Sequence, residues 1–201
     1  MHNKTQQTIV LASGNQGKIT EIQALLRDYT IVAQNAFNVS QVAETGTTFI
    51  ENALIKARHA CEQTQLPAIA DDSGLIVAAL NGAPGIISAR YSGLNATDKE
   101  NNQKLLTELQ AYPDEKRAAY FICVMVFLRH QKDSCPLIAQ GVWQGFITKQ
   151  PQGVHGFGYD SLFWLPQLNC TAAQLSATLK NQYSHRGQAT RQLAKLITAH
   201  Y

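Results

Sequence analysis

The chain of 201 residues has few charged side chains and no long apolar run. Aspartate, glutamate, lysine and arginine make up 15% of it, against roughly 25% in average soluble domains. The longest unbroken apolar run, Phe121–Leu128, is far shorter than the ~20 residues of a membrane-spanning helix, so we expect no membrane partner. The net charge of +3 falls short of a protein that coats nucleic acid, so we expect no nucleic-acid partner either.

Disulfide and secretion signals are also missing. The four cysteines, Cys61, Cys123, Cys135 and Cys170, are far apart and form no C-x-x-C pair. This pattern favours an intracellular chain with reduced thiols, although four cysteines can in principle pair. The N-terminal residues Met1–Thr5 lead straight into a strand-like run, without the apolar core of a secretory signal. We therefore expect a cytoplasmic location.

What the chain does have is enough apolar residues, 45%, to bury a core, and a length that suits one domain spanning residues 1–201. Apolar spacing and helix-capping signatures predict a mixed α/β fold. The predicted strands are 9–12, 68–70, 75–80, 118–129, 137–142 and 146–148, with Gly141 and Gly145 as kinks or turns. One predicted helix follows residue 18, and the others cover 49–61, 98–110, 172–180 and 187–200. Capping boxes open three of them, at Thr48/Glu51, Thr97/Glu100 and Thr171/Gln174.

The first candidate for chemistry is the turn Ser13-Gly14-Asn15-Gln16-Gly17-Lys18. A glycine-rich turn between a strand and a helix exposes backbone N–H groups at a helix N-terminus, where the helix dipole also favours anions. The turn is not a Walker A loop, because only two residues separate its glycines and Ile19 follows the lysine. When the segment is taken alone, an ordinary strand-to-helix turn is the favoured interpretation.

Carboxylates and a lysine supply two further candidates. Asp71 and Asp72 follow an apolar strand, and a carboxylate at a strand end suits Mg²⁺, although Asp-Asp-Ser-Gly is also a common turn. Consecutive side chains point in different directions, so we expect one of the two to face a given ligand. Lys56 falls on the apolar stripe of its helix, between Phe49, Ala53 and Ala60. It either lines a cleft or extends its stem to the surface.

The C-terminal half holds a basic cluster and an aromatic loop. Lys180, His185 and Arg186 lie within seven residues, and arginine can grip a phosphate or a purine carbonyl with two parallel hydrogen bonds. A solvated basic loop is the plain alternative. In residues 153–160, three glycines flank Phe157 and Tyr159, which lets a planar base stack close to the backbone, although glycine and aromatic residues also make hairpin ends. Neither H-E-x-x-H nor G-x-S-x-G occurs. Together these candidates fit a nucleotide polyphosphate bound with Mg²⁺.

Six blocks of the sequence resemble the inosine/xanthosine triphosphate pyrophosphatase family, also called XTP/dITP diphosphatases. They occur in family order along nearly the whole chain and comprise Ser13-Gly14-Asn15-x-Gly17-Lys18, Thr45-Gly46-x-Thr48-Phe49-x-Glu51-Asn52-Ala53-x-x-Lys56-Ala57, Asp71-Asp72-Ser73-Gly74-Leu75, Gly82-x-Pro84-Gly85-x-x-Ser88-Ala89-Arg90-Tyr91, Gly156-Phe157-Gly158-Tyr159-Asp160 and Ser184-His185-Arg186-Gly187. The resemblance implies a homodimer with a long mixed sheet flanked by helices, and an active-site cleft between two lobes. It also implies Mg²⁺-dependent hydrolysis of dITP, ITP and XTP to the monophosphate and pyrophosphate.

The resemblance also implies roles for single residues. Asp72 would bind the metal and accept the proton of the attacking water, and Glu44 matches a second acidic position that we take as a metal or water ligand. The substrate would be bound by Ser13, Gly14, Asn15, Gln16, Gly17, Lys18, Lys56, Ser73, Phe157, Gly158, Tyr159, Asp160, Lys180, His185 and Arg186. The chain departs from the family pattern at Ser161, where proline is usual, and the missing ring leaves the φ of that position unlocked.

Two other functions remain open. The same residues suit a nucleotide- or RNA-binding protein without turnover, although simple binding does not require a metal-activating carboxylate. They also suit a related pyrophosphatase that acts on pyrimidine or ordinary nucleotides. The preferred substrate among ITP, dITP and XTP, and the feature that excludes GTP, do not follow from the sequence.

Overall fold

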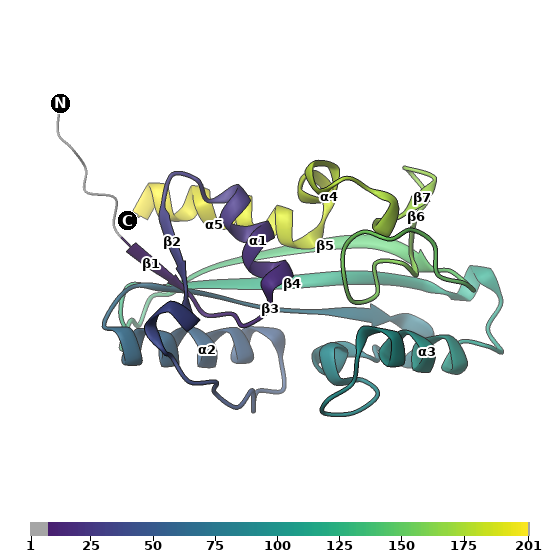
Figure 1. Ribbon diagram of the computed structural model, residues 1–201, viewed down its shortest axis with the longest axis horizontal. Coiled ribbons are helices and arrows are strands. Elements are labelled where there is room, and N and C mark those ends of the chain that lie inside the picture. The colour runs from purple at the N-terminus through teal and green to yellow at the C-terminus, as the bar shows by residue number, and fades with distance from the viewer. Residues whose placement is uncertain (1–7, 201) are drawn as a thin grey trace. The chain divides into compact units, whose positions relative to one another are not determined.

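The computed structural model describes residues 8–200 and contains one mixed sheet. Among these residues, seven strands follow the order β2-β1-β3-β4-β5-β6-β7 (Figure 1). They are β1 Thr8–Leu11, β2 Thr30–Ala33, β3 Ala68–Val77, β4 Ala118–Leu128, β5 Leu137–Ile147, β6 Phe163–Leu165 and β7 Cys170–Thr171. β1 pairs in parallel with β2 and β3, whereas β5–β6 and β6–β7 are antiparallel. The predicted α/β class with a mixed sheet is confirmed.

The helices are α1 Gln16–Leu25, α2 Phe49–Thr64, α3 Asp98–Glu108, α4 Ala177–Tyr183 and α5 His185–His200, with short 3₁₀ turns η1 Gln34–Phe37, η2 Ala78–Leu80, η3 Gly85–Arg90, η4 Asp114–Lys116 and η5 Ala172–Gln174. Capping boxes open α2 at Thr48 and α3 at Thr97, as predicted. The third box, at Thr171, forms but opens only η5, so the predicted continuous helix 172–180 is wrong. Ser176 caps α4 separately.

The chain forms two compact units. The first unit contains residues 1–72, 124–140 and 186–201, and the second contains 73–123 and 141–185. Strands β3, β4 and β5 each pass from one unit into the other. That residues 1–201 act as one domain, and that a cleft lies between two lobes, stay predictions. Residues Met1–Thr5, where no secretory segment was recognised, lie outside the described residues.

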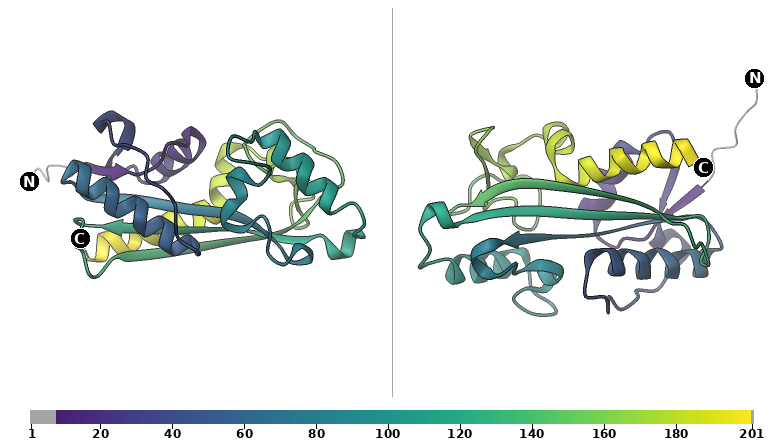
Figure 2. Two further views of the ribbon diagram at one scale, coloured as in Figure 1. Left: turned by 90° about the horizontal axis from the view of Figure 1, so that it is seen from below. Right: turned by 180° about the vertical axis from the view of Figure 1, so that it is seen from behind.

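In the first unit, α2 covers one face of the strands, and α1 and α5 cover the other (Figures 1 and 2). Helix α2 contributes small buried side chains, Ala53, Ala57 and Ala60 among them, which pack against alternate residues of β1 and β3. Small residues let the helix approach the sheet closely, so polar side chains of α2 also lie near the strands.

In the second unit, α3 and α4 lie on opposite sides of the strands (Figures 1 and 2). The core gathers aromatic side chains from distant segments, including Phe121, Trp143, Tyr159 and Phe163. The rings of Phe121 and Phe163 lie 4.6 Å apart between centroids. This core carries the aromatic loop that the sequence singled out.

Two sequence predictions placed turns where the structure has continuous strands. Residues 71–74 are not an acidic turn but the middle of β3, which ends at Val77 rather than Leu80. Gly141 and Gly145 both lie within β5, and a Cβ on Gly145 would stand 2.5 Å from the carbonyl oxygen of Trp164. In both places tertiary neighbours override local turn propensity, because ion pairs satisfy the carboxylates and the glycine allows β6 to approach.

Within residues 8–200, no helix combines the length and apolarity required to cross a bilayer. The cysteines of the same residues form no disulfide.

The hairpin between β4 and β5 is held by a buried carboxylate, which gives a stability prediction. Asp133 accepts hydrogen bonds from the backbone and guanidinium of Arg129 and from the N–H of Cys135. The Arg129 hydrogen bonds hold the pKa of Asp133 well below its ordinary value, although burial opposes this. We expect Asp133→Asn to lower the unfolding free energy at pH 7 by about 1–2 kcal/mol in urea titrations.

The pH dependence follows from the direction of that shift. A depressed carboxyl pKa stabilises the folded state fully above the unfolded value of about 3.9, and the stabilisation is lost as pH falls below it. The difference in unfolding free energy between wild type and Asp133→Asn is therefore smaller at pH 3 than at pH 7. The matched control is Asp114→Asn, which removes the exposed ion pair with Lys149 and changes stability little. Equal effects of the two variants would contradict the prediction.

Candidate active site

Residues Ser13–Lys18 form the start of α1 rather than a free turn. Asn15 is the N-cap, and its side-chain oxygen accepts the N–H of Lys18 at 3.1 Å. The Ser13 hydroxyl accepts the N–H of Asn15 at 3.2 Å. Gln16, Gly17 and Lys18 are therefore the first turn of a ten-residue helix, whose positive dipole end suits an anion. The predicted loop stops at Asn15, because its side chain caps the helix there.

The Lys18 side chain turns back to β3. Its Nζ lies 2.9 Å from Asp71 Oδ2, and Arg186 Nε of α5 lies 3.7 Å from the same oxygen. Burial disfavours the ionised form of Asp71, but the positive charges, those of Lys18 and Arg186 foremost, outweigh burial and hold its pKa well below the ordinary value. Arg186 also forms an ion pair with Glu21 of α1. Asp71 thus gathers two of the predicted cationic ligands on one side of β3.

Asp72 faces the other side of β3 and meets α2. Lys56 Nζ lies 3.5 Å from Asp72 Oδ1 and 2.7 Å from Glu44 Oε1. Of the two interpretations of Lys56, the structure shows a largely buried, paired lysine rather than one extended into solvent. Burial lowers the pKa of Lys56, but the neighbouring carboxylates outweigh it and raise the pKa.

Burial also acts on Asp72 itself. Its pKa is raised, first because burial penalises the charged form and then because Glu44 and Asp71 repel it, and the attraction of Lys56 and Lys18 does not cancel these effects. A carboxylate with a raised pKa is a stronger base than an ordinary aspartate. The two neighbouring aspartates therefore differ: the pKa of Asp71 is lowered by its ion pairs, and the pKa of Asp72 is raised by burial.

Asn52 is a site residue that the sequence analysis missed. It is completely buried on α2, donates through Nδ2 to Asp72 Oδ2 at 3.2 Å, and accepts the N–H of Gly46 through Oδ1 at 2.8 Å. A Cβ on Gly46 would stand 2.7 Å from that oxygen, so glycine is required there. Asn52 thus ties the segment that follows Glu44 to Asp72. The available signal was its position one helical turn before Lys56, on the buried face.

The donor set fits a divalent cation of the magnesium type. Glu44 and Asp72 offer carboxylate oxygens to the same ammonium group of Lys56, which places both within reach of one small cation. Among residues 8–200, no cluster of three or more His, Cys, Asp or Glu is arranged to hold a metal. Two carboxylates that are completed by substrate phosphates are the usual magnesium arrangement.

A second group of predicted residues meets in the second unit. Lys180 Nζ of α4 lies 2.6 Å from Asp160 Oδ2 and 4.6 Å from the centroid of the Phe157 ring. The same carboxylate accepts the N–H of Phe157 at 2.9 Å. The ion pair is buried, so the ammonium is held beside an aromatic face. This group combines a positive charge, a negative charge and a ring.

The remaining predicted residues have buried or half-buried positions. His185 stacks on Phe121 with centroids 4.7 Å apart and is buried in the aromatic core. Tyr159 is also buried, and its hydroxyl donates to the Ser88 carbonyl at 2.8 Å. Ser73 is half-buried on β3. The first unit therefore holds residues 13–18, Glu44, Lys56, Asp72 and Arg186, and the second holds Ser73, residues 157–160, Lys180 and His185.

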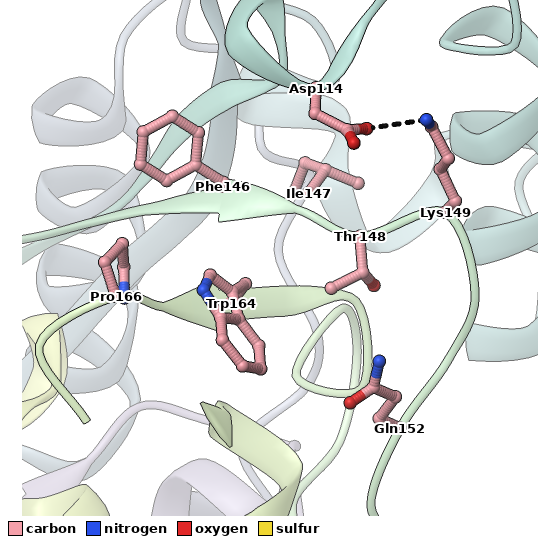
Figure 3. A pocket seen from close by; sticks show the side chains of 8 residues that line it. All are labelled: Asp114, Phe146, Ile147, Thr148, Lys149, Gln152, Trp164 and Pro166. Atoms are coloured by element: carbon pink, nitrogen blue, oxygen red, sulfur yellow. Dashed lines mark ion pairs between the residues drawn. The ribbon is translucent and has the colours of Figure 1, made fainter. Parts of the chain in front are cut away.

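The second unit also carries a pocket of about 530 Å³ (Figure 3). Its charged side chains, Asp114 and Lys149, form an ion pair with each other at 2.9 Å. None of the predicted site residues lines it; the lining is Asp114, Phe146, Ile147, Thr148, Lys149, Gln152, Trp164 and Pro166.

Known proteins match nearly the whole chain. The Ham1 family model matches residues 9–196. The dITP/XTP pyrophosphatase of Photobacterium profundum is 56% identical over 187 residues, which cover 92% of this chain and 95% of that protein. The dITP/XTP pyrophosphatase of Vibrio cholerae is 56% identical over 191 residues, which cover 94% and 96%.

Solved structures agree. A HAM1 protein from Coxiella burnetii matches with a TM-score of 0.89 and 52% identity, covering 96% of this chain and 99% of that one. The Staphylococcus aureus Ham1 protein matches with a TM-score of 0.85 and 40% identity, covering 97% and 100%. The resemblance drawn from the six sequence blocks is confirmed.

Two glycines of the aromatic loop give a matched stability test. Gly156 has φ +77°, and a Cβ there would lie 2.1 Å from Asp160 Oδ2, whereas Gly158 has φ +62° with no atom within 4 Å of its Cβ position. Both alanine variants strain the backbone by about 1 kcal/mol or more. We expect Gly156→Ala to cost about 1–3 kcal/mol beyond Gly158→Ala in urea unfolding, because it also displaces the Asp160 carboxylate. Equal costs would show that the carboxylate is not held where the structure places it.

Proposed function

This chain belongs to the Ham1 family, and we propose that it hydrolyses deaminated purine nucleoside triphosphates (dITP, ITP and XTP) to the monophosphate and pyrophosphate. Relatives more than half identical over nine-tenths of the chain are named dITP/XTP pyrophosphatase. The observation that carries the proposal is the pair of neighbouring aspartates on β3. Asp71 is paired with the cations of α1 and α5, and Asp72 is held by Lys56 and Asn52 of α2.

The first unit would bind the triphosphate. The N-terminal turn of α1 offers backbone N–H groups, and Lys18 adds positive charge that Asp71 keeps in place. Lys56 lies against Glu44 and Asp72, where it would offset the charge of incoming phosphates. Lys18 and Lys56 are both paired with carboxylates. An anion would therefore bind by competing with these ion pairs or by bridging them.

Asp72 would accept the proton of the attacking water. Its Oδ1 contacts Lys56 and its Oδ2 contacts Asn52, so the carboxylate plane is fixed by two donors. The raised pKa increases its basicity. We propose Mg²⁺ as the cofactor, held by Asp72 and Glu44; when bound, it would neutralise phosphate charge and polarise the phosphorus.

The second unit would bind the base and sugar. Phe157 offers a ring for stacking. Asp160 offers a hydrogen-bond acceptor, and Lys180 offers a donor. A donor that faces the 6-oxo group of hypoxanthine would meet an amino group in ATP, and an unpaired buried polar group costs about 1–3 kcal/mol. From the resemblance we also propose that Lys180, His185 and Arg186 close over the base. Arg186, which belongs to the first unit, or a neighbouring residue would read the 6-oxo group. The homodimer, which the resemblance implies, is also a proposal. So is the cytoplasmic location, which we expect from the cysteine pattern and the missing secretion signal.

A substrate panel tests the proposal directly. We expect the purified chain with Mg²⁺ to release pyrophosphate from dITP and XTP far faster than from GTP, dTTP or UTP. Chelation of the metal should abolish release, and adding Mg²⁺ should restore it. No release above background would favour a nucleotide-binding protein without turnover, and a preference for dTTP would favour the pyrimidine alternative.

The proton acceptor has its own test. Asp72→Asn keeps the shape of the side chain but removes its charge and basicity, so we expect kcat to fall at least about 100-fold, with nucleotide affinity changed much less. Calorimetric titration with dIMP measures that affinity apart from turnover. Asp28→Asn, an exposed position on the same unit, serves as the matched control and should keep the wild-type rate. A near-wild-type kcat for Asp72→Asn would assign the proton acceptor elsewhere.

A further inference from the structure

Two side chains of α3 that no sequence motif singled out form hydrogen bonds with the aromatic loop of residues 157–160. The N–H of Gly158 donates to Asp98 Oδ2 at 2.6 Å, and the carbonyl of Gly158 accepts from Asn102 Nδ2 at 3.0 Å. Asp98 and Asn102 stand one helical turn apart on α3, so both face the same partner. We call this pair the Gly158 clamp.

The clamp fixes a conformation that only glycine adopts readily. Gly158 has φ +62°, in the left-handed region. The clamp holds the two peptide groups on either side of its Cα, one through the N–H and the other through the carbonyl. The direction of the Phe157 side chain before it and of the Tyr159 side chain after it is therefore set from α3.

Helix α3 is itself fixed by hydrogen bonds to a neighbouring segment, so the two side chains of the clamp have a fixed position. Asn101, next to Asn102, accepts the N–H of Ser92 at 2.8 Å and donates to the Ala89 carbonyl at 3.1 Å. The same segment receives the Tyr159 hydroxyl, at the carbonyl of Ser88. The loop, the segment 88–92 and the first turns of α3 therefore form one hydrogen-bonded network within the second unit.

The groups proposed to contact the base belong to the same loop and to α4. Asp160 accepts the N–H of Phe157 and pairs with Lys180, whose ammonium stands over the Phe157 ring. We propose that Asp98 and Asn102 are positioning residues for base recognition: by holding the peptide groups beside Gly158 they set the pose in which Phe157, Asp160 and Lys180 receive the purine. The inference rests on the proposed function and deepens it, because it names what decides the fit of the base.

Removing either partner tests the clamp. Asp98→Ala removes the acceptor of the Gly158 N–H, so it should raise KM for dITP about three- to tenfold. Asn102→Asp replaces the donor of the clamp with a second acceptor that faces the Gly158 carbonyl. It should raise KM for dITP about three- to tenfold or more, with kcat/KM for ribose 5-triphosphate, which has no base, unchanged. Asn102→Ala should behave like Asn102→Asp, and Lys99→Ala, an exposed neighbour on α3, should behave like wild type.

Amide hydrogen exchange gives a readout that needs no activity. Exchange in a peptide covering residues 156–161 should rise in Asp98→Ala and in Asn102→Asp, and stay at the wild-type level in Lys99→Ala. Unchanged exchange in Asn102→Asp would overturn the clamp. An equal loss of kcat/KM for dITP and ribose 5-triphosphate, or an unchanged KM for dITP in Asn102→Asp, would overturn its role in base recognition. Failure of the wild type to hydrolyse dITP would instead refute the proposed function, a result that the exchange measurement separates from the clamp.

Discussion

The burial of two adjacent carboxylates in the middle of a strand is the constraint on which the first unit depends. Asp71 and Asp72 point to opposite faces of β3, and a buried carboxylate is costly unless it is paired. Each face therefore needs its own cations and donors. Helix α1 supplies Lys18 to one aspartate, and α2 supplies Lys56 and Asn52 to the other.

The different partners of the two aspartates also shift their pKa values in opposite directions. Close cations keep Asp71 ionised, so its role is to hold Lys18 and Arg186 in place. For Asp72, burial and carboxylate repulsion outweigh the attraction of the lysines, which leaves it the stronger base. The pKa values of two consecutive aspartates are thus shifted in opposite directions by the elements that pack against them. The proposed function, which places a polyanion next to a general base, would use this difference.

In the second unit, an aromatic face and a carboxylate belong to a loop that is itself neither helix nor strand, so its backbone has to be held by neighbouring elements. Its glycines allow the backbone to turn, and Gly156 leaves the space that Asp160 occupies. Hydrogen bonds from α3 and from the segment 88–92 then hold the turned backbone. A loop that is held at most of its residues loses little further entropy when it orders around a ligand, which favours affinity.

The sequence by itself determined the family, the α/β class, three capping boxes and the six blocks in which the charged candidates lie. Those features depend on local hydrogen bonding and on residue type, which are visible along the chain. It did not determine that residues 71–74 continue β3, that β5 runs unbroken through Gly145, or that the box at Thr171 opens only a short turn. Nor did it reveal Asn52, Asp98 or Asn102. Each of these outcomes depends on a partner distant in sequence, such as Lys18 for Asp71, Trp164 for Gly145 and Gly158 for Asn102, and only the tertiary structure brings such partners within hydrogen-bonding or contact distance.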